Sequence, residues 1–226
     1  MGIPDKAYLT ALMEEAMKKS YDFKYVSVDE NKLDITYIAT KKRNHLGLQE
    51  GLSAQNEMKT YQVKEVSSVR SNCRFYNKFF KANGRLHKVE AYVDGHDRLS
   101  TTYYAYYEGN KRYLFEYIGY DAEIKKNAVT IYVSVYDGDQ VIEAYTVRGS
   151  HIIYEKYDYT KSSRVDYYCI SYVPTGKYPV LGEYKGYFDP VTLDYTETFC
   201  KEIDKLFSAL DHDRVTILAI VITDGL

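Results

Sequence analysis

The sequence is poor in several features that identify common classes of protein. It has no tryptophan, four prolines and three cysteines in 226 residues. The cysteines, Cys73, Cys169 and Cys200, are far apart and form no C-x-x-C pair. This spacing argues against a disulfide framework and against a zinc site, and it favours reduced thiols in a reducing compartment.

Strong charge and long apolar runs are also lacking. The formal net charge is −2, and basic and acidic residues are interleaved, which is not the pattern of a protein that binds nucleic acid or anionic membranes. The longest largely apolar run, residues 215–222, is too short to span a bilayer. The N-terminus is charged by Asp5 and resembles no signal peptide. We therefore expect a soluble chain that is not secreted by the classical route, with no membrane partner and no sequence-specific nucleic-acid partner.

Motifs that carry catalysis are missing as well. Gly176-Lys177 lacks the glycine and the hydroxyl residue that a phosphate-binding loop needs, and no nucleophile elbow or paired-histidine zinc motif occurs. Asp94 with His96, and residues 211–213, supply two or three possible metal ligands each, without a distant partner. We predict no catalytic residue, no metal site, no cofactor and no enzyme activity.

The sequence is rich in tyrosine. It has 27, of which 20 lie between Tyr103 and Tyr195. Seven of them fall in the stretch Thr101–Asp121, on either side of Glu108-Gly109-Asn110, which is the pattern of a β-hairpin with a tight turn. Because tyrosines fall on both faces of the first run, we expect both faces of this hairpin to be covered.

The order of elements predicts an α+β, mainly β fold in a single domain over residues 1–226. An amphipathic helical arm is expected at residues 5–19, starting after Pro4. Residues 22–39 have the pattern of a hairpin, and residues 22–195 together form a β body whose regular turn signals predict an antiparallel β-sandwich. A capping box at Asp194 and Glu197 predicts a C-terminal helix, followed by a buried strand, within residues 196–226.

The apolar stripe of the N-terminal helix has two interpretations. The helix either docks on its own domain or reaches a neighbouring subunit, since terminal helices are easily exchanged between copies. The sequence does not separate the two. Our hypothesis is that it is an assembly helix that contacts a neighbour through Leu9, Leu12, Met13 and Met17.

Adjacent tyrosines indicate contacts outside the domain. Residues next to each other in a strand face opposite sides of the sheet, and tyrosine is enriched at protein interfaces. Core filling by a residue of high β-propensity explains many of the tyrosines, but it explains the doublets less well. The doublets are Tyr103-Tyr104, Tyr106-Tyr107 and Tyr167-Tyr168.

Two short motifs resemble insect-virus polyhedrins. Tyr104-Ala105-Tyr106-Tyr107, followed by Glu108-Gly109, is similar to a strand and turn of cypovirus polyhedrins. The pattern Tyr195-Thr196-x-x-Phe199-x-x-x-Ile203-Asp204-Lys205 resembles a helix near the C-terminus of baculovirus polyhedrins. Upstream, Ile170-Ser171 lies where a similar strand lies in both groups.

The resemblance implies a viral structural protein. Such proteins have a β-sandwich core with helices, associate with themselves, often as trimers, and crystallise around virions in occlusion bodies in the cytoplasm of the infected cell. The partners that the resemblance implies are other copies of the chain and virions. The alternative from the residues alone is a bacterial immunity or antitoxin-type protein, located in the bacterial cytoplasm, whose Tyr-rich hairpins bind a toxin.

Tyrosine titration supplies the last prediction. An unperturbed phenol ionises near pH ~10, and a buried phenol ionises at a higher pH. We expect an assembly that is stable at neutral pH and dissolves in alkali as its phenols lose their protons. The doublet residues are the candidates for this alkaline switch: Tyr103, Tyr104, Tyr106, Tyr107, Tyr167 and Tyr168.

Overall fold

The computed structural model describes residues 4–40, 48–52, 54, 65–70, 73–93, 99–118, 128–161 and 164–188. The chain divides into two units, residues 1–189 and 190–226, and all of the described residues belong to the first. The predicted C-terminal helix and buried strand, in residues 196–226, lie outside the described residues.

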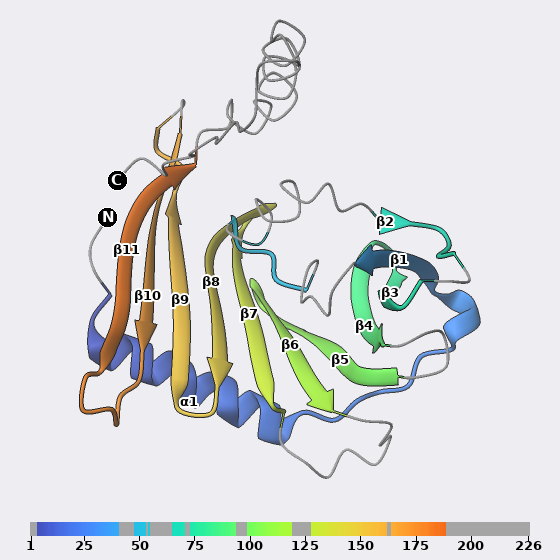
Figure 1. The fold of residues 1–226 in the computed structure, drawn as a ribbon, viewed down its shortest axis with the longest axis horizontal. Coiled ribbons are helices and arrows are strands. Elements are labelled where there is room, and N and C mark those ends of the chain that lie inside the picture. Colours follow the sequence, from blue (N-terminus) through green and yellow to red (C-terminus); the bar gives the residue numbers. More distant parts are fainter. Residues whose placement is uncertain are drawn as a thin grey trace, which may run out of the picture. The chain divides into compact units, whose positions relative to one another are not determined.

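The described part is mainly β, as predicted, with one α-helix, a 3₁₀ turn and one antiparallel sheet (Figure 1). The helix is α1 (Lys6–Asp22) and the 3₁₀ turn is η1 (Glu30–Lys32). The strands are β1 (Asp34–Thr40), β2 (Glu65–Val66), β3 (Phe75–Ala82), β4 (Arg85–Tyr92), β5 (Leu99–Glu108), β6 (Lys111–Ile118), β7 (Thr130–Asp137), β8 (Gln140–Arg148), β9 (His151–Asp158), β10 (Val165–Tyr172) and β11 (Val180–Phe188).

Helix α1 begins where the sequence predicts and ends three residues later. The side chain of Asp5 caps it by accepting a hydrogen bond from the Ala7 N–H, which satisfies one of the free amides of the first turn. Its apolar stripe faces the sheet, and α1 crosses β7, β8 and β9 on one face (Figure 1).

From β3 to β11 the strands follow one another as a meander of successive hairpins, whereas β1 lies between β2 and β3 in the sheet. Their order in the sheet is β11-β10-β9-β8-β7-β6-β5-β4-β3-β1-β2, and every neighbouring pair is antiparallel. The predicted turn at Asn83-Gly84 has positive φ at both residues, as a two-residue hairpin loop requires. The predicted hairpin around Gly109 is confirmed as β5 and β6.

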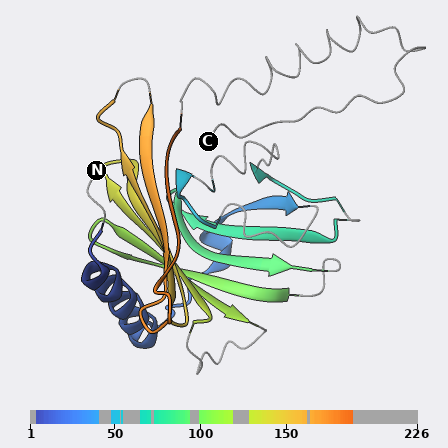
Figure 2. The ribbon, with the colours of Figure 1, turned by 60° about the vertical axis from the view of Figure 1, so that its left-hand side comes forward.

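The predicted β-sandwich is not confirmed, because the described strands form one sheet. The sheet bends, so that β1, β3 and β4 turn away on the side opposite α1 (Figure 2). Apolar residues of β1, β3 and β4 then share one buried cluster with residues of β5, β6 and β7. That cluster contains Ile38, Leu48, Phe79, Leu86, Val89, Tyr103, Leu114 and Tyr132. Each face of the bent sheet thus has its own core, and the sequence pattern of two covered faces arises without a second sheet.

The prediction of a hairpin over residues 22–39 is wrong. Residues 23–29 form no strand, and β1 pairs with β3 and β2 instead. The aromatic residues of this segment pack on the α1 side of the sheet: the Phe23 ring lies 4.8 Å from that of Phe115, and the Tyr25 ring lies 4.3 Å from that of Tyr104. The alternating aromatic residues suggested a strand with backbone pairing, but their rings instead pack on the sheet without it.

Candidate functional site

The four residues of the predicted assembly helix lie against the chain's own sheet. Leu9, Leu12 and Met13 are buried in the core on the α1 side, and Met17 is partly buried against the same core. This is docking on the same chain, one of the two alternatives that the sequence left open. While α1 stays docked, these side chains are covered, and their role in assembly stays a prediction.

Polar contacts fix α1 on the β5–β6 hairpin. The Glu15 carboxylate accepts hydrogen bonds from the Tyr113 hydroxyl at 2.5 Å and from the Lys111 ammonium at 2.6 Å. One turn further along, Lys19 pairs with Glu108 at 2.6 Å. Burial alone would raise the pKa of the Glu15 carboxyl. The hydrogen bond from the Lys111 ammonium is the largest effect in the other direction, and the pKa is lowered overall. A helix held by both apolar burial and these ionic contacts belongs to the domain.

The six tyrosines predicted as an alkaline switch do not form one surface. Tyr103, Tyr104 and Tyr168 are buried, Tyr106 and Tyr167 are half-buried, and Tyr107 is exposed at the turn end of β5. Tyr104 belongs to the core on the α1 side and Tyr103 to the opposite core, as alternation along a strand requires. Burial raises the pKa of Tyr104. For the buried members, ionisation therefore acts on the fold itself.

The second face of the hairpin is covered by residues 48–52, a segment that the sequence did not single out. The guanidinium of Arg112 donates to the Leu48 carbonyl at 2.9 Å and pairs with Glu50 at 2.7 Å. The Leu52 N–H donates to the Tyr157 hydroxyl, and a side chain at Gly51 would meet that hydroxyl at 2.7 Å. Residues 48–52 show no helical or strand periodicity in the sequence, because each of their contacts with the sheet is made by a single residue.

A cleft of about 260 Å³ lies beside this segment. Its polar lining includes Gln49, Glu50, Ser134, Thr146 and Glu155. It is smaller than the roughly 300–1,000 Å³ usual for small-molecule sites, and three of its polar side chains are joined to neighbours. Gln49 donates to Thr146, Glu50 pairs with Arg112, and Glu155 accepts from Tyr157. The cleft is therefore a weaker candidate for a functional site than the edge strand described next.

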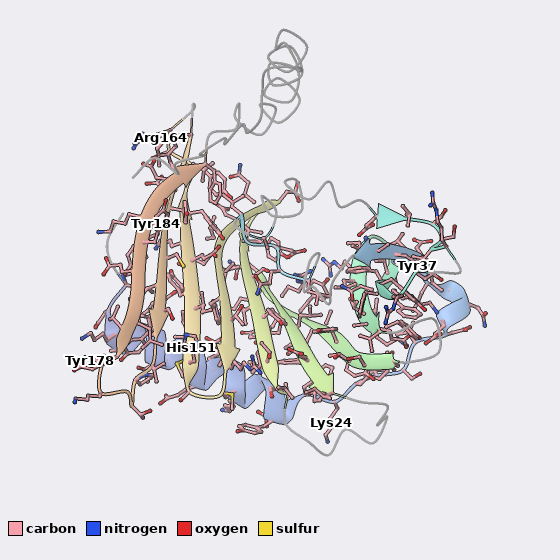
Figure 3. All side chains as sticks on the ribbon, in the orientation of Figure 1. Lys24, Tyr37, His151, Arg164, Tyr178 and Tyr184 are labelled. Carbon is pink, nitrogen blue, oxygen red and sulfur yellow. The ribbon has the colours of Figure 1, made fainter. Side chains whose placement is uncertain are left out.

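The outermost strand, β11, is the stronger candidate. It pairs with β10 on one side, and the described residues place no strand on its other side. Leu181, Tyr184 and Tyr187 expose 61%, 57% and 61% of their surface, which is unusual for large side chains in a sheet. Figure 3 shows Tyr184 along β11 and Tyr178 beyond the start of that strand. A long edge strand with exposed apolar residues is a template for pairing with another chain.

Aromatic rings line one side of this edge. The ring of Tyr167 on β10 lies 5.5 Å from that of Tyr184 and 4.5 Å from that of Phe188. Burial first, and then the neighbouring Tyr184, raises the pKa of Tyr167; Glu155 and Cys169 add to this. Tyr167 is the member of the predicted switch whose ring contacts side chains of the edge strand β11. Sequence reasoning missed Tyr184 and Tyr187, which no doublet marks.

The search for other sites gave two further results. Among the described residues, no group of three or more His, Cys, Asp or Glu side chains could hold a metal ion. No helix within the described part is long and apolar enough to cross a membrane.

No family model, no curated protein and no solved structure matches this chain.

Proposed function

We propose that this protein is a structural protein that associates with itself, in assemblies that hold at neutral pH and come apart in alkali. The observation that carries the proposal is the edge strand β11, beside which the described residues place no further strand, with Leu181, Tyr184 and Tyr187 exposed. Natural sheets protect their edges with short strands, bulges, prolines or charges. β11 is nine residues long, with two charged residues, Glu183 and Lys185, and a register irregularity near its start at Leu181. From Gly182 to Phe188 it pairs regularly with β10, and so the backbone and exposed tyrosines of this stretch gain by being covered.

The alkaline response follows from the phenols at this edge. Tyr184 lies directly opposite Cys169 on β10 and diagonal to Tyr167, whose ring it contacts, and Glu155 on β9 lies opposite Cys169. The guanidinium of Arg164 lies 5.0 Å from the ring centre of Tyr187, whereas no cation is among the groups named here around Tyr167. Below pH ~10 the phenols are neutral and pack as rings. Because the pKa of Tyr167 is raised, its phenolate forms only in stronger alkali, where it lies near the Glu155 carboxylate and opposes a contact built on neutral rings.

The polyhedrin resemblance extends the proposal to a particular assembly. The assembly is then the crystalline matrix of viral occlusion bodies, in the cytoplasm of an infected cell, and alkaline dissociation releases the enclosed virions. Expression in insect cells, followed by electron microscopy for intracellular crystals, tests this extension. Soluble expression without crystals would remove the extension and leave self-association to be judged in solution.

The test of self-association is sedimentation velocity on the purified chain over a range of concentrations. We expect oligomers near pH 7.5 and dissociation above about pH 10, with far-UV circular dichroism recorded to show that the fold persists. The double variant Tyr184→Phe/Tyr187→Phe should still associate and should dissociate at a higher pH. Tyr21→Phe, an exposed tyrosine on α1, is the control and should not move the transition.

Two outcomes would count against the proposal. If the chain is monomeric at every concentration near neutral pH, self-association is excluded, and the immunity-protein alternative becomes the better hypothesis. If the chain associates but the double variant dissociates at the same pH as the original chain, the phenols of β11 are not the switch.

A further inference from the structure

The two faces of β11 carry different residues. Glu183 and Lys185 lie opposite Ile170 and Tyr168, which belong to the core on the α1 side. Tyr184 lies opposite Cys169 and so points to the other face. Glu183 and Lys185 therefore flank Tyr184 along the strand, with opposite charges on the same face. Both are exposed and lie 3.8 Å apart.

This order of charges is complementary to itself. In an antiparallel pair of identical strands related by a twofold axis, the residue before the centre lies opposite the residue after it. We infer that β11 pairs antiparallel with β11 of a second copy of the chain, with the twofold axis at Tyr184. Glu183 then lies opposite the partner's Lys185, and Lys185 opposite the partner's Glu183. This pairing rests on the self-association proposed above, and it specifies which strand forms the contact and which residues lie opposite each other.

Neighbouring registers are disfavoured by charge. With the axis at Glu183, two glutamates lie directly opposite each other, and with the axis at Lys185, two lysines do. Like charges directly opposite destabilise a strand pair, and opposite charges stabilise it, by roughly 0.2–1 kcal/mol each. The register centred on Tyr184 is the one of these three that forms two ion pairs and no like-charge pair.

The two glycines of β11 fit the same register. Without a side chain at Gly186, the rings of Tyr184 and Tyr167 lie close over its backbone; a Cβ there would be 2.7 Å and 2.9 Å from ring carbons of these tyrosines. At Gly182, by contrast, nothing lies within 4 Å of a Cβ position. In the twofold pair, Gly182 lies opposite the partner's Gly186. The open space at Gly182 therefore adjoins the partner's Tyr184 ring, and glycines in a strand often mark such close approach.

The apolar residues are covered by the same pairing. Leu181, the extra residue at the irregularity near the start of β11, comes close to the partner's Tyr187, and each of these residues is 61% exposed in the single chain. Twofold symmetry repeats the contact at the other end of the strand pair. The register thus buries exposed apolar surface at both ends and forms ion pairs near the centre.

Charge exchange tests the surface and the register together. Glu183→Lys and Lys185→Glu should each turn both ion pairs into like-charge pairs, and should raise the dissociation constant of the β11 contact by about tenfold or more. The double exchange Glu183→Lys/Lys185→Glu restores the complementarity and should associate within about threefold of the original chain. Glu14→Lys and Lys18→Glu, which make the same charge changes at exposed positions of α1, are the matched controls and should associate normally.

A disulfide cross-link tests the register alone. Residues directly opposite in an antiparallel pair have Cα atoms about 4.5–5.5 Å apart, within the range that a disulfide spans. Tyr184→Cys should therefore form a covalent dimer on mild oxidation. The variant is made with all three native cysteines replaced by alanine, because Cys169 lies opposite Tyr184 in the same chain and would compete. Val180→Cys in that background is the control: it leaves both ion pairs in place, lies opposite the partner's Phe188 in this register and so is far from its own copy, and should not cross-link.

The outcomes separate the two proposals. If the unmodified chain is monomeric, self-association fails, and β11 pairing fails with it. If the chain associates but both single charge reversals leave association unchanged, self-association stands and β11 is not the surface. If the charge reversals act as expected but Tyr184→Cys forms no covalent dimer, the register is wrong. Circular dichroism of every variant shows whether a loss of association reflects a loss of fold.

Discussion

The central strands and the edge strand β11 use tyrosine in different ways. In β5–β9 the rings of Tyr113, Tyr145 and Tyr154 are buried under α1. On β11, Tyr184 and Tyr187 are more than half exposed. The residue type and the strand conformation are the same in both regions. What differs is whether another element covers the sheet, so an excess of tyrosine indicates covered surfaces without saying which chain covers them.

The largest expected effect comes from the same substitution made in each region. Leu9→Ala removes a fully buried side chain from under α1 and should lower the free energy of unfolding by about 2–5 kcal/mol. Leu181→Ala on β11 should change it by less than about 0.5 kcal/mol. Urea denaturation in dilute solution measures both. Equal effects would show that β11 is part of the core and would remove the contrast between the two regions.

The second prediction concerns the face opposite α1. Arg112 is buried and joins β6 to Leu48 and Glu50. Arg112→Met leaves the Leu48 carbonyl and the Glu50 carboxylate without this partner, and should cost about 2–3 kcal/mol; the value is below that of a fully buried pair because the side chain of Glu50 is 34% exposed. Arg148→Met, an exposed arginine on β8, is the control in the same denaturation assay. A cost under 0.5 kcal/mol would mean that residues 48–52 do not cover the sheet in solution.

The third prediction compares two buried phenols on the α1 face. Tyr113→Phe loses the hydrogen bond to Glu15 and should destabilise by about 1.5–2 kcal/mol. The Tyr145 hydroxyl has no hydrogen-bond partner among the described residues, and so Tyr145→Phe should be neutral or slightly stabilising. Thermal and urea unfolding of both variants check the sign of each change. A destabilised Tyr145→Phe would show that its hydroxyl finds a partner in solution.

The smallest expected effect is a change in pH dependence. Burial, with the neighbouring Tyr104 as a lesser cause, raises the pKa of Tyr117 to about 12. A phenol whose pKa is raised by folding stabilises the fold fully below its unfolded value near 10, and this stabilisation is lost as pH rises from there towards 12. Between about pH 9 and pH 11, the original chain should therefore lose about 1 kcal/mol more of its free energy of unfolding than the Tyr117→Phe variant does. Urea unfolding at the two pH values measures this. Tyr21→Phe, with its exposed ring on α1, should show no such difference, and equal behaviour of the two variants would contradict the prediction.

Local patterns in the sequence determined much of the fold. The helical spacing of Leu9, Leu12, Met13 and Ala16 determined α1 and its buried face, because a stripe at that spacing is stable when it is covered. Turn residues such as Asn83-Gly84 and Gly109 determined the hairpins, because their backbone angles favour glycine or asparagine. These features depend on residues close together in the chain, and so they can be predicted without knowing the rest of the molecule.

Tertiary structure alone decided the number of sheets, the covering of each face and the identity of the open edge. Strand alternation shows that a face is buried, but it is the same whether a second sheet, a bent part of the same sheet or a helix covers it. Phe23 and Tyr25 packed against the core, and Arg112 met Leu48, through contacts between segments far apart in the chain. For the same reason the doublets included Tyr167, whose role in a switch stays a prediction, and did not include Tyr184. Which tyrosine stands at an edge depends on the order of strands in the sheet, and no local pattern encodes that order.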